Sequence, residues 1–401
     1  MLEGASIICF AHDWDGDPTS KTHIMRILAR RNKILWVNSI GMRRPTVSGR
    51  DVRRLVRKLR RALGGCREVE ANLFVTNPLV IPLPGVPAAD RVNTAILAAS
   101  LRRLGRRLGF ERPILWTFLP NVNRLVGRLS ERLVIYHCVD EYAAFSGVDR
   151  ETLVAMERDL VRKADLVLTS GETLRDERRQ HNPNTHFIAH GVDVDHFAKA
   201  MDPTVPVPAD IAPIPRPIIG FFGLLADWVD IEMFRSLALA RPDWSIVLIG
   251  KTATDVSSLY AVPNVHFLGQ KPYAALPAYC RAFDVGIIPF KTNELTVRAN
   301  PLKLREYLAA GLPVVATPLP EVARYDGLVR LAAGRDDFLA AIAYSLADRG
   351  DARRRERIDE MRSESWNARV DAISRLIVQR LQERSDGGAD APAHGRVVMR
   401  G

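Results

Sequence analysis

The chain has 401 residues, a formal net charge of +11 and a hydrophobic content of 47%. A chain of this length exceeds what one hydrophobic core usually supports, so we expect two domains. The sequence contains no apolar run long enough to cross a bilayer and does not begin like a signal peptide, which argues against a membrane-spanning or secreted protein. We therefore expect a cytoplasmic protein.

Short apolar runs bounded by turn residues predict strands that alternate with helical stretches along the whole chain. In the first half, the predicted strands are residues 7–10, 34–37, 73–76, 114–117, 133–137, 166–169 and 186–189. In the second half, they are residues 218–222, 245–249, 265–268, 285–288, 314–316 and 328–331. This alternation predicts an α/β protein with two parallel sheets, in which ligands bind at the carboxyl ends of the strands.

A proline-rich segment separates the two sets of strands and predicts a stiff extended linker. We therefore place a first domain at residues 1–200, the linker at residues 201–217 and a second domain at residues 218–350. Further helices are expected over residues 351–385. Residues 386–401 are rich in Gly, Ala and charge, and they are expected to form a disordered tail.

Basic residues are concentrated between Arg43 and Arg61, where nine Arg or Lys accompany a single acid, Asp51. Within residues 43–63, an apolar stripe flanked by arginines predicts a basic amphipathic helix. Each basic residue near an anionic leaflet is worth about 1 kcal/mol, so we predict peripheral binding to the inner membrane. The alternative is a helix packed on the first sheet with a solvated basic face. Nucleic acid is not an expected partner, because no recognisable binding motif is present.

The loop after the first predicted strand is a candidate sugar-binding site, because it leaves the carboxyl end of that strand. His12, Trp14 and Asp15 suit sugar binding, the tryptophan by stacking and the polar side chains by contacts with hydroxyl groups. Residues 17–20 of the same loop are equally well explained by a turn and a helix cap.

The sequence N-P-L-K-L-R-E-Y-L-A-A-G-L-P-V-V, which begins at Asn300, is the most informative in the chain. Asn300 is a good N-cap and Pro301 suits the first helical position, and Gly311 is expected to end the helix. Lys303 then lies in the first turn, where a cation is disfavoured unless an anion such as a phosphate lies in front of it. Glu306, on the same face, is placed to accept hydrogen bonds from hydroxyls such as those of a ribose. A surface pair of Lys303 with Glu306 is the alternative.

This block is similar to the nucleotide-sugar site of GT-B glycosyltransferases of the bacterial exopolysaccharide and cell-surface polysaccharide type, such as family 1 and 4 and xanthan glucuronosyltransferase-like enzymes. Residues 264–269, 284–290 and 190–193 follow the order of that family, and the resemblance covers most of residues 5–350. It implies two Rossmann-like domains that face each other across a cleft, with the donor in the second domain and the acceptor in the first, where the loop of His12, Trp14 and Asp15 is the candidate acceptor site. It also implies that Lys303 binds the diphosphate and Glu306 the ribose.

Three further donor contacts are predicted in the second domain. Gly223, after the first strand, allows backbone N–H groups to approach a phosphate. The family often has a cation a few residues later, but residues 226–228 here are Ala-Asp-Trp, and Lys251 after the next strand is placed to compensate. The resemblance places the nucleotide base near residues 269–273, which include Tyr273.

The catalytic machinery departs from that of the retaining members of the family. These carry two glutamates eight positions apart, and the position eight before Glu306 is Arg298, with Glu294 as a weak substitute. Direct displacement needs a base that takes the proton of the acceptor. Asp140, which follows a strand of the first domain, is the first candidate and Asp13 the second, although a helix-cap role would also explain Asp140.

Neither metal nor cofactor is expected. The four cysteines lie far apart, with no histidine at metal-ligand spacing, and no acids form the D-x-D metal site of the other large glycosyltransferase fold. The resemblance therefore implies a metal-independent glycosyltransferase (EC 2.4) that moves a sugar from a nucleotide sugar to a lipid-linked or polysaccharide acceptor in exopolysaccharide or cell-envelope biosynthesis. The alternatives are a nucleotide-sugar epimerase of the same fold and a non-catalytic basic module that binds a membrane or nucleic acid.

Overall fold

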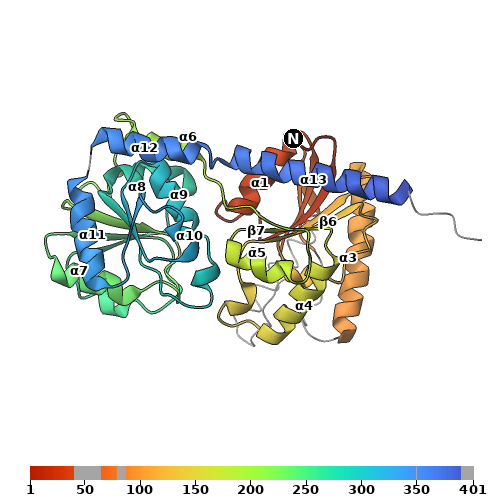
Figure 1. Ribbon diagram of the computed structural model, residues 1–401, viewed down its shortest axis with the longest axis horizontal. Helices are drawn as coiled ribbons and strands as arrows, with labels where there is room; N and C mark the ends of the chain where they lie inside the picture. The colour runs from red at the N-terminus through yellow and green to blue at the C-terminus, as the bar shows by residue number, and fades with distance from the viewer. Residues whose placement is uncertain (40–64, 79–86, 349, 390–401) are drawn as a thin grey trace, which may run out of the picture.

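The computed structural model describes residues 1–39, 65–78, 87–348 and 350–389. These residues form two α/β domains that lie side by side, each with one sheet between layers of helices (Figure 1). The predicted architecture of two parallel-sheet domains is therefore confirmed. The predicted basic segment, residues 43–63, lies outside the described residues.

The first sheet has eight strands in the order β3-β4-β2-β1-β5-β6-β7-β8. Their bounds are β1 Ser6–Phe10, β2 Lys33–Val37, β3 Cys66–Glu70, β4 Leu73–Thr76, β5 Ile114–Thr117, β6 Leu133–Cys138, β7 Leu166–Thr169 and β8 Thr185–Phe187. All pairs are parallel except the edge pair of β3 with β4. Strand β3 is not among the strands predicted from the sequence, since its charged residues lack the apolar run that marks a buried parallel strand.

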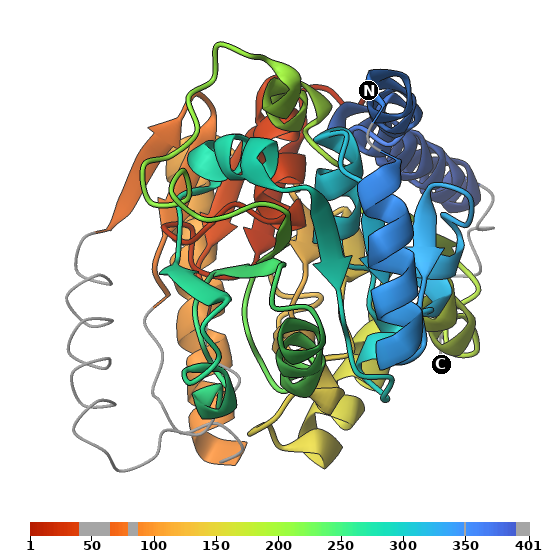
Figure 2. The ribbon, with the colours of Figure 1, turned by 90° about the vertical axis from the view of Figure 1, so that its left-hand side faces the viewer.

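The second sheet has six strands in the order β11-β10-β9-β12-β13-β14, and all its pairs are parallel. Their bounds are β9 Ile218–Phe222, β10 Ser245–Ile249, β11 Val265–Gly269, β12 Val285–Ile288, β13 Val314–Ala316 and β14 Val329–Leu331. The strands are apolar and mostly buried, because helices cover both faces of the sheet (Figure 2). Strand polarity brings β9, β10 and β12 to one edge, where the turns that follow them meet.

Helices fill the connections between the strands. In the first domain they are α1 Ser20–Ala29, α3 Pro87–Leu108, α4 Arg150–Lys163 and α5 Glu172–Arg179. In the second domain they are α6 Val194–Phe197, α7 Ile231–Ala240, α8 Leu276–Ala282, α9 Leu302–Ala309, α10 Pro320–Ala323, α11 Arg335–Ala347 and α12 Asp351–Arg362. Short 3-10 helices are η1 Pro120–Val122, η2 Tyr142–Ala144, η3 Ala198–Met201, η4 Ser257–Leu259, η5 Tyr273–Ala275 and η6 Thr296–Arg298.

The last helix, α13 (Trp366–Ala389), leaves the second domain and packs against α1 of the first (Figure 1). Its residues Trp366, Val370 and Ile373 belong to the hydrophobic core of the first domain. The chain therefore crosses between the domains twice, once through the proline-rich segment and once into α13. Helix α13 continues to Ala389, so residues 386–389 are helical where a disordered tail was expected. Residues 390–401 lie outside the described part.

Candidate active site

The helix that carries the predicted donor site begins one residue later than expected. The first residue of α9 is Leu302, and Pro301 takes the N-cap position. Asn300 is not the N-cap: its amide donates to the carbonyl oxygen of Ser170 in the first domain at 2.6 Å and its oxygen accepts from Arg305 at 2.5 Å. Lys303 nevertheless lies in the first turn, and Gly311, with φ of +75°, ends the helix as predicted.

Lys303 holds its ammonium group over two aromatic rings of the second domain. Its Nζ lies 5.0 Å from the ring centroid of Phe221 and 4.7 Å from that of Phe290. Burial lowers the pKa of Lys303 to about 8, although the charge of Glu306 acts in the opposite direction. A cation that is desolvated at a helix N-terminus is a costly arrangement in the absence of an anion. The arrangement is therefore suited to bind a phosphate.

Glu306 lies one turn further along α9 and is also removed from water. Burial raises its pKa to about 7, while the charge of Lys303 acts against this rise. Hydrogen bonds from hydroxyl donors stabilise the charged form of a carboxylate. A ligand with adjacent hydroxyls would therefore favour ionised Glu306, as the predicted ribose contact requires.

Two glycine turns bring the backbone close to Lys303. Gly223 follows β9 with φ of +135°, and a Cβ atom there would lie 3.0 Å from Cε of Lys303. Gly250 follows β10 with φ of +148°, and a Cβ atom there would lie 1.9 Å from the carbonyl oxygen of Gly223. The two turns thus pack directly on each other, and only glycine fits at Gly250. The next residue, Lys251, is exposed at the same edge of the sheet.

Tyr273, the first residue of η5, connects the second domain to α1 of the first. Its ring stacks on that of His196 with centroids 4.7 Å apart, and it contacts the ring of His23 in α1 at 5.5 Å. Burial and the charge of Glu306 raise the pKa of the Tyr273 hydroxyl. The structure therefore brings Gly223, Tyr273, Lys303 and Glu306 to one region at the edge that faces the first domain.

In the first domain, Asp140 follows the carboxyl end of β6 and is partly buried. Burial raises the pKa of Asp140 to about 6, with Lys21 lowering it and Glu141 raising it. Lys21 donates to the hydroxyl oxygen of Tyr142 at 3.2 Å, and its Nζ lies 5.8 Å from the ring centroid of Phe118. With a pKa of about 6, Asp140 is largely ionised at neutral pH, as a general base must be.

Lys21 was missed by the sequence analysis, yet its setting matches that of Lys303. Each is the second residue of a helix at the edge of its sheet, each points at aromatic rings, and burial lowers the pKa of each. The signal was a lysine in the first turn of a predicted helix. The same argument that applies to Lys303 therefore also applies to the start of α1.

The three predicted acceptor residues are placed differently. Both ring nitrogens of His12 are buried without a hydrogen-bond partner, and burial lowers its pKa to about 4. The Trp14 ring contacts the Trp36 ring edge-on, with the ring centroids 5.0 Å apart, and the Arg26 guanidinium lies 5.1 Å from the Trp14 ring centroid. Asp15 forms an ion pair with Arg67. His12 therefore has free hydrogen-bonding capacity in this loop, whereas Trp14 and Asp15 already have partners. Asp13 lies in the same loop and is partly buried.

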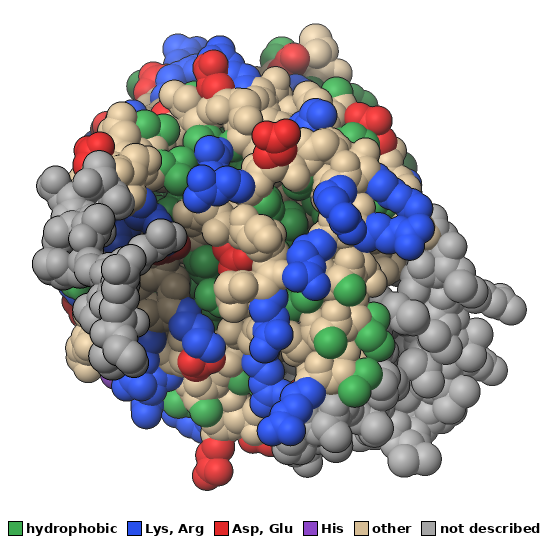
Figure 3. All heavy atoms as spheres, turned by 90° about the vertical axis from the view of Figure 1, so that its right-hand side faces the viewer, with side chains coloured by type: hydrophobic (Ala, Val, Ile, Leu, Met, Phe, Trp, Pro, Cys, Tyr) green, Lys and Arg blue, Asp and Glu red, His purple; other side chains and the backbone are tan. Residues whose placement is uncertain are grey.

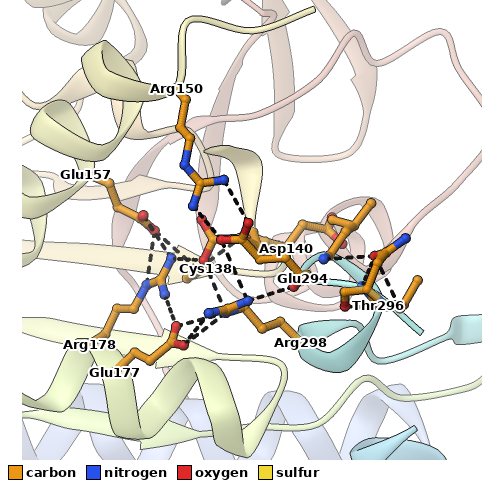
Figure 4. A network of polar contacts seen from close by, with 12 residues as sticks. Cys138, Asp140, Arg150, Glu157, Glu177, Arg178, Glu294, Thr296 and Arg298 are labelled. Carbon is orange, nitrogen blue, oxygen red and sulfur yellow. Dashed lines mark hydrogen bonds and ion pairs between the residues drawn. The ribbon is translucent and has the colours of Figure 1, made fainter. Parts of the chain in front are cut away.

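Arg298, at the position of the first glutamate of retaining relatives, faces the first domain (Figure 4). Its Nε donates to Glu177 of α5 at 2.9 Å, and its Nη1 donates to the backbone oxygen of Glu294 at 2.7 Å. Glu294 in turn forms a bidentate pair with Arg150 of α4, at 2.5 and 2.8 Å. Both positions are thus occupied by contacts between the domains.

A buried arginine connects this network to the Asp140 segment. Arg178 pairs with Glu141 at 2.7 Å, with Glu157 at 2.9 Å and with Glu177 at 2.6 Å (Figure 4). Its side chain and those of Glu141 and Glu157 are at most 10% exposed, so removing one partner would leave an unpaired buried charge. The chain segment that carries Asp140 is therefore held rigidly to α4 and α5.

Comparison with known proteins identifies the family. Residues 216–348 match the family model of glycosyl transferases group 1. Over 278 residues the chain is 30% identical to TuaH of Bacillus subtilis, a protein assigned to teichuronic acid biosynthesis as a glycosyltransferase; the match covers 64% of this chain and 70% of TuaH. The chain belongs to the GT-B glycosyltransferases of the cell-surface polysaccharide type.

Solved structures agree with the fold of this glycosyltransferase. Anabaena HepE in complex with UDP aligns over 96% of this chain and 99% of its own, with a TM-score of 0.58 and 14% identity. Sucrose-phosphate synthase from Thermosynechococcus elongatus aligns over 94% of this chain and 100% of its own, with a TM-score of 0.66 and 16% identity. At these identities the likeness concerns the fold, which confirms the GT-B arrangement that the sequence predicts.

Two features of the glycosyltransferase concern membranes and metals. Among the described residues, no helix is long and apolar enough to cross a bilayer. Within the same part of the chain, no group of three or more His, Cys, Asp or Glu side chains lies close enough together to hold a metal ion.

Proposed function

We propose that the enzyme transfers a sugar from a nucleotide-sugar donor to a lipid-linked or polysaccharide acceptor, with inversion at the anomeric carbon and without a metal ion. The observation that carries the proposal is the desolvated Lys303 ammonium at the start of α9, packed against the Gly223 turn. A nucleoside diphosphate supplies the anion that this site lacks. Glu306 then accepts hydrogen bonds from the ribose, and Tyr273 lies beside the nucleotide.

Asp140 takes the proton in the proposed step. The acceptor hydroxyl gives its proton to the Asp140 carboxylate while its oxygen bonds to the anomeric carbon of the donor. The bond between that carbon and the phosphate oxygen breaks, and the nucleoside diphosphate leaves with the electron pair. Lys303 and the N-terminus of α9 stabilise the charge that develops on the leaving group. Lys21 keeps Asp140 ionised near neutral pH, since its charge lowers the pKa of that carboxyl.

Inversion is favoured because no carboxylate is free at the position where retaining relatives carry their first glutamate. Arg298 occupies it and is bound to Glu177, and the nearby Glu294 is paired with Arg150. A single displacement by the acceptor needs no such group, only a base on the acceptor side.

The acceptor and location are proposed from the relatives and the charge pattern. TuaH is assigned to teichuronic acid biosynthesis, and we propose that this enzyme likewise builds a cell-envelope or exopolysaccharide polymer. The growing polymer or its lipid carrier would be met at the cytoplasmic face of the inner membrane. The basic segment 43–63 is proposed to bind the anionic surface there.

The decisive experiment combines a donor screen with an Asp140→Asn variant. UDP-sugars are tested first, because HepE is known in complex with UDP. The variant keeps the shape of the side chain but removes the proton acceptor, so turnover should fall by about 10² to 10⁴ with little change in donor affinity. Asp359→Asn, which changes an exposed acid of α12, is the control.

Each alternative has its own outcome in this experiment. Near-normal turnover of Asp140→Asn with a large loss in Asp13→Asn would move the base to Asp13. Inactivation by EDTA would contradict the metal-independent mechanism. NMR detection of a product that retains the anomeric configuration of the donor would overturn direct displacement. Release of free sugar without any acceptor would indicate an epimerase.

A further inference from the structure

Helix α3 exposes one continuous face that divides into an apolar half and a basic half. The apolar half contains Val92, Ala95, Ile96 and Ala99, and the basic half contains Arg102, Arg103, Arg106 and Arg107. The spacing of these eight residues places them on the same side of a helix with 3.6 residues per turn. Val92 is 46% exposed and Ile96 39%. The opposite side, with Leu97, Ala98 and Leu101, is buried in the core of the first domain.

The four arginines lack the carboxylate partners that other exposed arginines have. None of them forms an ion pair with a residue in the described part of the chain. In the second domain, by contrast, Arg353 pairs with Glu356 at 2.8 Å. Arginines four positions apart repel each other on a helix, and the dipole at the helix C-terminus offsets only part of that cost. The α3 cluster is therefore suited to an external anion.

A cavity beside the basic half adds depth to this surface. It has a volume of about 440 Å³ and is lined by Arg102, Arg106, Arg112, Phe110 and Leu129, among others. Guanidinium groups bind phosphate through two parallel hydrogen bonds, and an apolar wall beside them suits the carbon atoms attached to such a group. The cavity thus offers charged and apolar contacts together.

The face points away from the second domain, on the outer side of the first (Figure 1). On this side of the molecule, Lys and Arg side chains gather next to a group of hydrophobic ones, and acidic side chains are few (Figure 3). An anionic bilayer presents phosphates at its surface and acyl chains just below, which matches both halves of the face.

We propose that this face of α3 binds the surface of a bilayer that contains anionic phospholipids. Val92 and Ile96 enter the boundary between headgroups and acyl chains, and the arginines and the cavity hold the phosphates of the headgroups. The residues of this face are different from those of the predicted basic segment 43–63. It requires neither a donor nor an acceptor, so the proposal holds or fails independently of the proposed reaction.

The full-length protein is tested by sedimentation with vesicles of phosphatidylcholine, with and without phosphatidylglycerol. The parent protein should bind only the anionic vesicles, and salt should weaken binding. Replacing Arg102, Arg103, Arg106 and Arg107 with Gln should lower the vesicle partition coefficient by more than about tenfold. Val92→Ser with Ile96→Ser should also weaken binding, which a purely electrostatic contact would not show.

The matched control removes the same charge from the second domain by replacing the exposed Arg335, Arg353, Arg355 and Arg362 with Gln. If both quadruple variants lost vesicle binding equally, binding would depend only on the net charge of the protein, and the proposal would be overturned. A second result would also overturn it. In that case, vesicle binding is lost completely when Arg53, Arg54, Arg57 and Lys58 are replaced, and it is unchanged when the four α3 arginines are replaced. Inorganic phosphate at matched ionic strength should compete poorly; full competition would identify a free-phosphate site instead of a membrane surface.

Discussion

Replacing Lys303 with Met tests the donor site most directly, because Met keeps much of the side-chain volume and removes only the charge. In the unliganded protein, burial lowers the pKa of Lys303 from 10.5 to about 8. Such a difference corresponds to about 3 kcal/mol against the buried cation, and this penalty remains after the favourable charge of Glu306 has been included. A bound diphosphate provides the missing anion, and a charge-assisted contact of this kind is worth about 1.5 to 3 kcal/mol. We therefore expect the dissociation constant of the donor to rise by about 10- to 150-fold in Lys303→Met.

The pH dependence makes this prediction specific to Lys303. The donor binds the protonated lysine, so its affinity should fall as pH rises through about 8, by about tenfold between pH 7 and pH 9. Glu306 has the opposite sign: with its pKa raised to about 7, donor affinity should fall as pH decreases below that value. Lys303→Met should lose the alkaline decrease and Glu306→Gln the acidic one. Folding without donor has the opposite dependence on pH: the Lys303 penalty is present below about pH 8 and disappears towards the unfolded pKa of 10.5, so the stability of the unliganded protein should increase over this range.

Calorimetric titration with an intact nucleotide sugar, whose phosphates do not titrate in this range, measures both effects. Lys199→Met, which removes an exposed lysine outside the site, is the control. An unchanged dissociation constant in Lys303→Met would refute the site assignment. If the alkaline decrease persisted in that variant, another group would be responsible for it. Thermal unfolding of unliganded Lys303→Met should show no loss of stability, which separates a binding defect from misfolding.

Three further predictions concern the neighbours of this site. Lys21→Met removes the charge that lowers the pKa of Asp140, so the acidic limb of the profile of kcat/KM against pH should move to higher pH; an unchanged limb would show that Lys21 does not tune the base. Gly250→Ala places a methyl group 1.9 Å from the carbonyl oxygen of Gly223, so thermal stability and donor affinity should both decrease, whereas Ala at the open position Gly334 should be neutral. Arg298→Gln breaks the contact with Glu177 between the domains, and turnover should fall several-fold while the dissociation constant of the donor stays constant, since the donor contacts lie within the second domain. A large change in donor affinity would instead place Arg298 at the nucleotide sugar.

Local pattern was sufficient for most of the fold but not for contacts between distant segments. Buried parallel strands appear in the sequence as apolar runs, so thirteen of the fourteen strands in the described part of the chain could be predicted from a short window of residues, as at Leu73–Thr76, where the predicted bounds are those of the structure. Strand β3 carries the charged sequence C-R-E-V-E and was missed. Asn300 was assigned as an N-cap on local preference alone. Its amide is instead bound to Ser170, a partner 130 positions away that no local rule could supply.

The two domains combine the same kinds of residue for different purposes. On the proposed donor side, Lys303 and Glu306 belong to one helix, and both are proposed to contact the ligand directly. On the acceptor side, Lys21 and Asp140 come from different elements, and the lysine acts on the carboxylate through its charge. Burial raises the pKa of both carboxyls, yet Asp140, at about 6, is ionised at a lower pH than Glu306, at about 7. Near neutral pH the proposed base is therefore mostly charged before the donor arrives, whereas Glu306 is only about half charged, and hydrogen bonds from a ligand would shift it further towards its charged form. In the proposed mechanism, the acceptor side is thus ready for proton transfer, and the charge of Glu306 depends on donor binding.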